Sequence, residues 1–165
     1  METLWHELSF GIADGRQLTV AVIRIVAAAL FGAAIGFERG RAGKAAGLRT
    51  HLLVTIGTAV FVLGCLASGF GPDPISRVIQ GIITGIGFIG AGSIIKLNDE
   101  EQVKGLTTSA GIWMAAAIGV TTGLGEVGLA ALATLLALLI LRSTLSLEEK
   151  LHMKTGKGKE KKVDQ

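Results

Sequence analysis

The sequence is poor in the residues that build disulfide-stapled, metal-binding or ordinary soluble domains. Its single cysteine, Cys65, excludes a disulfide within the chain and offers no metal-ligand spacing. Charged residues make up only 18% of the 165 residues, against about 25% in soluble domains. Half of the residues are hydrophobic and the mean hydropathy is +0.58, so a soluble domain of this composition would expose large apolar patches. Lipid would cover the same patches, and the composition therefore favours a membrane protein.

What the chain does contain is a series of apolar segments separated by short polar ones. A helix needs about 20 residues to cross a bilayer, where it satisfies its own backbone polar groups. The first three segments meet this length, the fourth meets it with modest extension, and the fifth meets it if Arg142 reaches the surface and the helix runs to Leu147. The sequence thus predicts an all-α membrane protein with five transmembrane helices, over residues 18–37, 52–70, 78–95, 106–122 and 127–141.

The distribution of basic residues predicts the orientation of this five-helix domain, residues 18–147. Lys and Arg are concentrated after the first, third and fifth segments, whereas the opposite side carries only Arg16 and Arg77. The positive-inside rule then places the N-terminus outside and the C-terminus in the cytoplasm. Residues 1–17 are acidic rather than basic, which argues against a signal peptide and predicts a periplasmic segment. Residues 148–165 are rich in Lys and broken by Gly, which predicts a disordered cytoplasmic tail.

The stretch Gly85–Gly90 spells G-x-G-x-x-G, a pattern found in dinucleotide-binding loops. That fingerprint needs a preceding strand and an acidic residue about 20 positions later, but here the glycines lie inside an apolar run that ends at Lys96. Small residues four apart instead allow membrane helices to approach closely, within one chain or between copies. The predicted helix-packing residues are Gly32, Gly36, Gly81, Gly85, Gly87, Gly90 and Gly92.

Polar residues gather at the predicted cytoplasmic ends, chiefly in GFERGRAGKAAGLRTH at 36–51. The positive-inside rule explains the Lys and Arg of this stretch, but not its small residues or Glu38 at the helix end. Arg24 lies within the first segment, where a charge costs about 2.5–3.5 kcal/mol, so it extends outward, has a buried partner or lines a substrate path. Intramembrane hydroxyls more often bond a neighbouring helix than a ligand. The predicted functional polar cluster is Arg24, Glu38, Arg39, Lys44, Arg49, Thr50, His51, Asn98, Thr107 and Thr108.

Metal binding and catalysis find little support in the sequence. A Mg²⁺ site uses one or two carboxylates and retained waters, yet Glu38 and Glu126 flank the predicted spans on opposite sides. His51 is the one histidine near a span, so no Ser-His-Asp or Cys-His set can be assembled. We therefore expect no metal, no cofactor, no nucleic-acid partner and no enzymatic activity.

Three motifs, GFERGRAGKAAGLRTHLLVTIG, GIITGIGFIGAGSI and VKGLTTSAGIWMAAAIGVTTGLG, resemble the membrane domain of the MgtC/SapB family over roughly residues 20–141. The resemblance implies a bacterial inner-membrane protein associated with magnesium limitation and, in pathogens, with survival inside macrophages. It also implies action through other membrane proteins, including the proton-translocating ATP synthase, and many members add a soluble C-terminal domain where this chain has its Lys-rich tail. The signature positions that it implies are Arg24, Glu38, Arg39, Lys44, Arg49, Thr50, His51, Gly85, Gly87, Gly90, Gly92, Gly105, Leu106, Thr107, Thr108 and Trp113.

These observations lead to one functional prediction and one alternative. The prediction is a regulatory or adaptive role linked to magnesium limitation, exerted through membrane-protein partners. The alternative is a transporter or channel for Mg²⁺ or another cation. The small-residue faces at Gly32/Gly36 and Gly81/Gly85 further predict a homo-oligomer in the lipid bilayer, with a dimer favoured.

Overall fold

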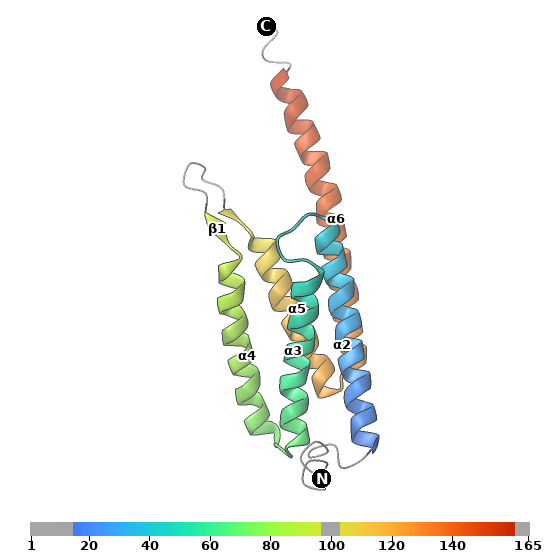
Figure 1. Cartoon of the computed structure of the whole chain (residues 1–165). Helices are drawn as coiled ribbons and strands as arrows, with labels where there is room; N and C mark the ends of the chain where they lie inside the picture. The colour runs from blue at the N-terminus through green and yellow to red at the C-terminus, as the bar shows by residue number, and fades with distance from the viewer. Residues whose placement is uncertain (1–14, 97–102, 161–165) are drawn as a thin grey trace.

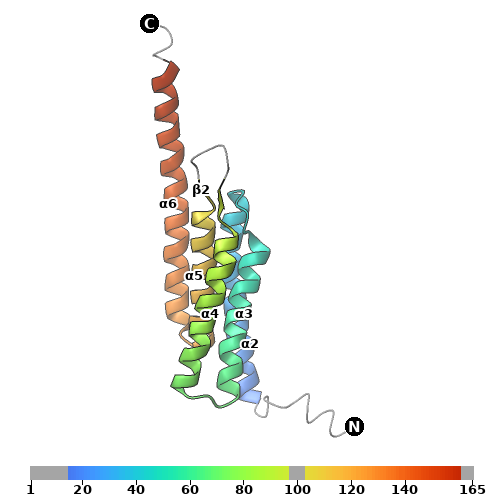
Figure 2. The ribbon, with the colours of Figure 1, turned by 90° about the vertical axis from the view of Figure 1, so that its left-hand side faces the viewer.

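The computed structural model describes residues 15–96 and 103–160, with side chains described at 15–94 and 104–143. Five helices and one two-stranded ribbon make up this part of the chain (Figure 1). In chain order the elements are α2 (Gly15–Arg41), α3 (Leu48–Ala67), α4 (Pro72–Gly92), β1 (Ile95–Lys96), β2 (Val103–Lys104), α5 (Leu106–Leu124) and α6 (Val127–Glu160). The helices lie alongside one another in an elongated bundle, seen from a second side in Figure 2.

Helices α2, α3 and α4 are long and apolar enough to cross a membrane, and α6 contributes a shorter apolar stretch at Val127–Ser143. Large apolar side chains point outward from the bundle, among them Phe88 at 84% exposed and Leu53 at 72% exposed. Such a surface suits lipid rather than water. The prediction of an all-helical membrane architecture is confirmed at this level, since the strands β1 and β2 contribute only two residues each.

Helix α5 lies at the centre of the bundle and contacts α2, α3, α4 and α6. Its sequence carries threonines and glycines among its apolar residues, and these small or polar residues are among its buried positions, Thr108, Gly111, Gly119, Thr122 and Gly123. Because neighbouring helices surround it, α5 needs close packing more than it needs a lipid-facing apolar surface. This explains how α5 accommodates buried threonines and glycines among its apolar residues.

Glycines of α2 and α5 make close contacts with α3. A Cβ atom added at Gly36 would lie 2.7 Å from Leu48 Cα, and one added at Gly123 would lie 2.9 Å from the Ala59 carbonyl oxygen. Gly32 and Gly119 face Thr55 and its neighbours on α3 in the same way. The sequence left open whether these glycines pack helices within one chain or between two copies. The structure shows that Gly32, Gly36, Gly119 and Gly123 pack against α3 of the same chain.

The glycines of α4 behave differently from those of α2 and α5. Gly90 lies against Ser109, whose Oγ would be 2.6 Å from an added Cβ. An added Cβ would meet no atom within 4 Å at Gly81, Gly85, Gly87 or Gly92, among the residues that the structure describes. These four glycines therefore make no close packing contact with the described part of the chain.

Two local features differ from the sequence-based predictions. The apolar run over 78–95 ends in the antiparallel ribbon, which pairs Ile95 with Lys104 and Lys96 with Val103. Helix α6 continues through the Lys-rich segment to Glu160 and projects beyond the bundle (Figure 1), where a disordered tail from residue 148 was predicted. Leu, Glu and Lys have high helix propensity, and a segment that extends an existing helix avoids the cost of nucleation.

Candidate functional site

Three helices bring buried polar side chains together at one end of the bundle. A short connection between α2 and α3 folds back tightly, with Lys44 N donating to the Arg39 carbonyl oxygen at 3.0 Å and Gly43 adopting a positive φ of 64°. Arg39, in the last turn of α2, and His51, in the first turn of α3, are thereby placed at the same end as Thr108 in the first turn of α5. We call Arg39, His51 and Thr108 the buried polar cluster.

Arg39 is nearly enclosed, with 2% of its surface exposed. Its Nη2 donates a hydrogen bond to Thr108 Oγ1 at 3.3 Å, which joins α2 to α5. The neighbouring Nε is buried and has no hydrogen-bond partner among the described residues. A buried guanidinium with so few partners is costly for a fold to maintain, which makes Arg39 a candidate for a role beyond stability.

His51 is completely buried, and its Nδ1 lies 2.9 Å from the Gly47 carbonyl oxygen. Because a carbonyl oxygen can only accept, we assign a proton to Nδ1, and in the neutral ring Nε2 is then the accepting nitrogen. That Nε2 is buried and has no partner in the described part of the chain. It faces Gly111 of α5, where an added Cβ would lie 3.4 Å away. His51 therefore fills the space that this glycine leaves open.

Glu38 lies beside the cluster but is engaged with another helix. One of its oxygens, Oε2, accepts a hydrogen bond from Arg142 Nε at 3.2 Å, so the ion pair ties the end of α2 to α6. Glu38 is 12% exposed whereas Arg142 is 67% exposed. The prediction that Arg142 reaches the surface is consistent with this exposure, but its role as the partner of Glu38 was missed. A basic residue at the end of the last apolar segment was the signal that could have suggested it.

Arg24 does not belong to the buried polar cluster. It precedes Arg39 by 15 positions on α2, or about 22 Å at the helical rise. Its Nη1 donates to the Gly123 carbonyl oxygen at 2.8 Å, and its guanidinium also contacts Gly125, which has a positive φ of 100°. Of the alternatives for Arg24, the structure favours the partner, which is the C-terminal end of α5, where a cation is favourable.

The other residues of the predicted functional polar cluster are not enclosed with Arg39, His51 and Thr108. Lys44, Arg49 and Thr107 are exposed, and Thr50 is partly buried. Asn98 lies outside the described residues. Among the predicted lysines and arginines of 36–51, Arg39 is buried, whereas Lys44 and Arg49 are exposed.

Buried hydroxyls in the bundle bond their own helices rather than a neighbouring one. Thr55 Oγ1 donates to the His51 carbonyl oxygen at 3.0 Å, and Thr122 Oγ1 donates to the Ile118 carbonyl oxygen at 2.7 Å. Thr108 differs, because its Oγ1 accepts a hydrogen bond from Arg39, which lies on a different helix. Within the described ranges, no group of three or more His, Cys, Asp or Glu side chains is arranged to hold a metal ion.

The buried polar cluster lies within the part of the chain that is similar to known proteins. The MgtC family model matches residues 25–150. "Putative magnesium transporter YhiD" of Escherichia coli (strain K12) is 43% identical over 129 residues, which cover 73% of this chain and 58% of that protein. "Protein MgtC" of Salmonella typhimurium (strain LT2) is 43% identical over 117 residues, covering 71% of this chain and 49% of that protein. "Protein SrpB" of Synechococcus elongatus is 40% identical over 129 residues, covering 72% of this chain and 71% of that protein. The chain spans about half the length of the first two relatives, and no solved structure matches it.

Proposed function

Since this chain is a membrane protein that belongs to the MgtC family, we propose that it serves adaptation to magnesium limitation by binding other proteins of the bacterial inner membrane. In this proposal the bundle is a binding scaffold and not a pathway for ions. The ATP synthase, to which the family resemblance points, is the first partner to test.

The chemistry of the buried polar cluster carries the proposal. Its groups are a guanidinium, an imidazole and a hydroxyl, and the adjacent carboxylate of Glu38 is paired with Arg142. Mg²⁺ requires oxygen ligands and retains several of its waters, so a buried guanidinium opposes its passage. Arg39 Nε and His51 Nε2, which have no partner among the described residues, instead suit polar contacts that switch with a small movement of α2, α3 or α5.

The alternative function is transport of Mg²⁺ or another cation. It is favoured by the name of the YhiD relative, which is 43% identical to this chain over 129 residues. Reconstitution separates the two functions. Purified protein in liposomes loaded with a magnesium-sensitive dye should leave the internal Mg²⁺ concentration unchanged when Mg²⁺ is added outside. Saturable Mg²⁺ entry that empty liposomes lack would overturn the scaffold proposal in favour of transport.

Complementation of a deletion strain at limiting magnesium tests whether the buried polar cluster is needed for function. Arg39→Gln and Thr108→Val should each abolish growth because both remove the bond between α2 and α5. Arg49→Gln is the matched control, because Arg49 is exposed at the same end of the bundle. Membrane abundance is measured alongside. Wild-type growth with Arg39→Gln would exclude a functional cluster, and growth that merely follows abundance would assign Arg39 to folding.

We further propose that α5 and α6 cross the membrane together with α2, α3 and α4, so that the N-terminus faces outward and the C-terminus faces the cytoplasm. The concentration of Lys and Arg at one end of the bundle supports this orientation. A cytoplasm-dependent reporter fused to the C-terminus should be active and a periplasm-dependent reporter silent. The reverse pattern would contradict the orientation.

A homodimer is proposed on the basis of the open glycine face of α4. Gly81 and Gly85 meet no atom within 4 Å among the described residues, so a second copy could approach closely there. Mass measurement in mild detergent and in nanodiscs should give a dimer. A monomeric mass in both environments would exclude it.

A further inference from the structure

Two nitrogen atoms of the buried polar cluster have no hydrogen-bond partner among the described residues. They are Arg39 Nε, whose N–H can only donate, and His51 Nε2, which accepts in the assigned tautomer. Arg39 is 2% exposed and His51 is fully buried, so bulk solvent does not reach either atom. Buried donors and acceptors are costly to leave unpaired, and native proteins usually satisfy them with other protein groups or with ordered water.

Three contacts place these two side chains beside each other. Gly36 lies one turn before Arg39 on α2, and a Cβ added at Gly36 would lie 3.1 Å from His51 Cβ. On α5, Thr108 Oγ1 accepts the hydrogen bond from Arg39 Nη2. Gly111 follows one turn later on α5 and lies opposite His51 Nε2. The positive charge of Arg39 also acts on the imidazole, so both nitrogens border one small region between α2, α3 and α5.

Gly111 leaves room for a small ligand in this region. A Cβ added at Gly111 would lie 3.4 Å from His51 Nε2, which is an ordinary contact distance, and would meet no other atom within 4 Å outside its own stretch of α5. The imidazole therefore reaches toward this space without closing it to a group the size of a methyl. A water molecule is smaller than a methyl group, and the donor and acceptor at the border give the space the polarity that a buried water needs.

The chemistry of the two nitrogens selects the ligand. A metal cation would be repelled by the guanidinium, and the nearby carboxylate of Glu38 is paired with Arg142. An anion such as chloride could accept from Arg39 Nε but could not donate to His51 Nε2. Water does both, because its oxygen accepts from the N–H and its O–H donates to the imidazole. The hydroxyl proton of Thr108 can supply a further bond to the same water.

We propose that one water molecule occupies the space beside Gly111 and bridges Arg39 Nε to His51 Nε2. This water links α2 to α3, whereas the direct bond from Arg39 to Thr108 links α2 to α5. All three helices are then joined by polar contacts at this end of the bundle. The inference does not depend on the proposed partner-binding function, because it concerns only how the buried polar cluster is held together.

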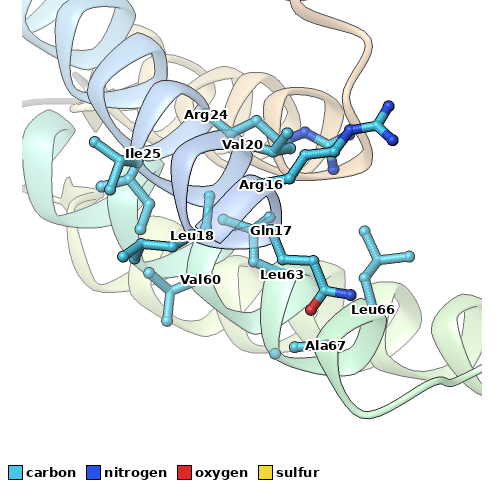
Figure 3. Close-up of a pocket in the computed structure, with 13 residues that line it drawn as sticks. Arg16, Gln17, Leu18, Val20, Arg24, Ile25, Val60, Leu63, Leu66 and Ala67 are labelled. Carbon is cyan, nitrogen blue, oxygen red and sulfur yellow. The ribbon is translucent and has the colours of Figure 1, made fainter. Parts of the chain in front are cut away.

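A larger cavity elsewhere in the bundle has a different chemistry. It has a volume of about 620 Å³ and lies between the first turns of α2 and the last turns of α3 (Figure 3). Its walls are formed mainly by apolar side chains such as Leu18, Ile25 and Leu63, which offer water no hydrogen bonds. Volume alone does not hold an ordered water, whereas the donor and acceptor that face each other beside Gly111 do.

Solid-state NMR of the full-length protein in lipid bilayers tests the bridge. The substitutions His6→Gln and His152→Gln leave His51 as the single imidazole of the chain. We expect an unprotonated Nε2 with a cross-peak to the proton of a bound water, and no hydrogen-bond cross-peak to the Arg39 Nε proton. A protonated Nε2 would favour an anion, and a direct cross-peak between the two side chains would replace the water. Either result, or an absent water cross-peak, would overturn the proposal.

Gly111→Ala tests the position of the water, because the added methyl fills the space without a steric clash. We expect this variant to lose the water cross-peak and to unfold at a lower midpoint than wild type, although alanine has the higher helix propensity. Gly57→Ala on α3 is the matched control, because a Cβ added at Gly57 would meet no atom within 4 Å among the described residues. It should keep the cross-peak and unfold at an equal or higher midpoint.

Two results from these variants would contradict the bridge. One is a water cross-peak that survives in Gly111→Ala, and the other is a midpoint that rises in Gly111→Ala as it does in Gly57→Ala. If Gly111→Ala does not fold, the spectrum of the protein with Gly111 intact still decides whether a water bonds His51 Nε2.

Discussion

The packing of α2 against α3 can be tested by two alanine substitutions in glycine motifs of the same spacing. At Gly36, an added Cβ would lie 2.7 Å from Leu48 Cα and 3.1 Å from both the Gly47 carbonyl oxygen and His51 Cβ. Two of these three atoms belong to the backbone and cannot rotate away, so α2 and α3 must separate. At Gly85, an added Cβ would meet no atom within 4 Å in the described structure.

The expected difference between the two variants follows from opposing effects. Alanine is favoured over glycine inside a helix by about 1 kcal/mol. Overpacking costs about 1–3 kcal/mol, and the backbone contacts at Gly36 place it near the upper limit. We therefore expect Gly36→Ala to lower the free energy of unfolding by about 2 kcal/mol, and Gly85→Ala to leave it unchanged or raise it by up to about 1 kcal/mol.

The assay is reversible unfolding in mixed detergent micelles, with helix content followed by circular dichroism. Because Gly36 also contacts His51, Gly36→Ala should in addition impair growth at limiting magnesium. Wild-type stability of Gly36→Ala would refute the close contact between α2 and α3. A larger loss for Gly85→Ala than for Gly36→Ala would show that the open face of α4 packs against another molecule.

Three further substitutions test individual contacts. Gly111→Ser should raise the free energy of unfolding by about 1 kcal/mol relative to Gly111→Ala, because the new hydroxyl can donate to His51 Nε2, which has no partner in the described structure. Equal stability of the two variants would contradict the assigned tautomer. Arg24→Gln should lower the free energy of unfolding by about 1.5–3 kcal/mol through loss of the charged hydrogen bond to the Gly123 carbonyl oxygen, and a neutral effect would favour a side chain extended into solvent. Arg142→Gln should cost less than about 1 kcal/mol, and less still at high salt, because this arginine is 67% exposed; a cost of several kcal/mol would show that its ion pair is buried.

Much of the architecture could be predicted from composition and residue order alone. The uncharged run at 52–70 corresponds to α3 at Leu48–Ala67, and the run at 78–95 corresponds largely to α4. Helix formation is local, because each backbone group bonds within its own segment, so an apolar stretch of the right length is enough to indicate it. The prediction of an MgtC-type membrane protein is confirmed for the same reason, since its motifs are contiguous in the sequence.

The buried polar cluster could not be predicted from the sequence, because it is formed by contacts between residues far apart in the chain. Arg39 and Thr108 are 69 positions apart, and nothing in the spacing of the sequence distinguishes the buried Arg39 from the exposed Arg49. Gly36 and Gly85 stand in the same four-residue motif, yet one contacts the backbone of α3 and the other faces open space.

The sequence by itself thus determined that the chain forms apolar helices and which end of the bundle carries its basic residues, because these properties follow from local hydrogen bonding and charge order. Only the tertiary structure decided that Arg39 is buried and bonded to Thr108, that His51 is enclosed against Gly111, and that Arg24 bonds the end of α5. Burial and pairing depend on how the helices turn toward one another.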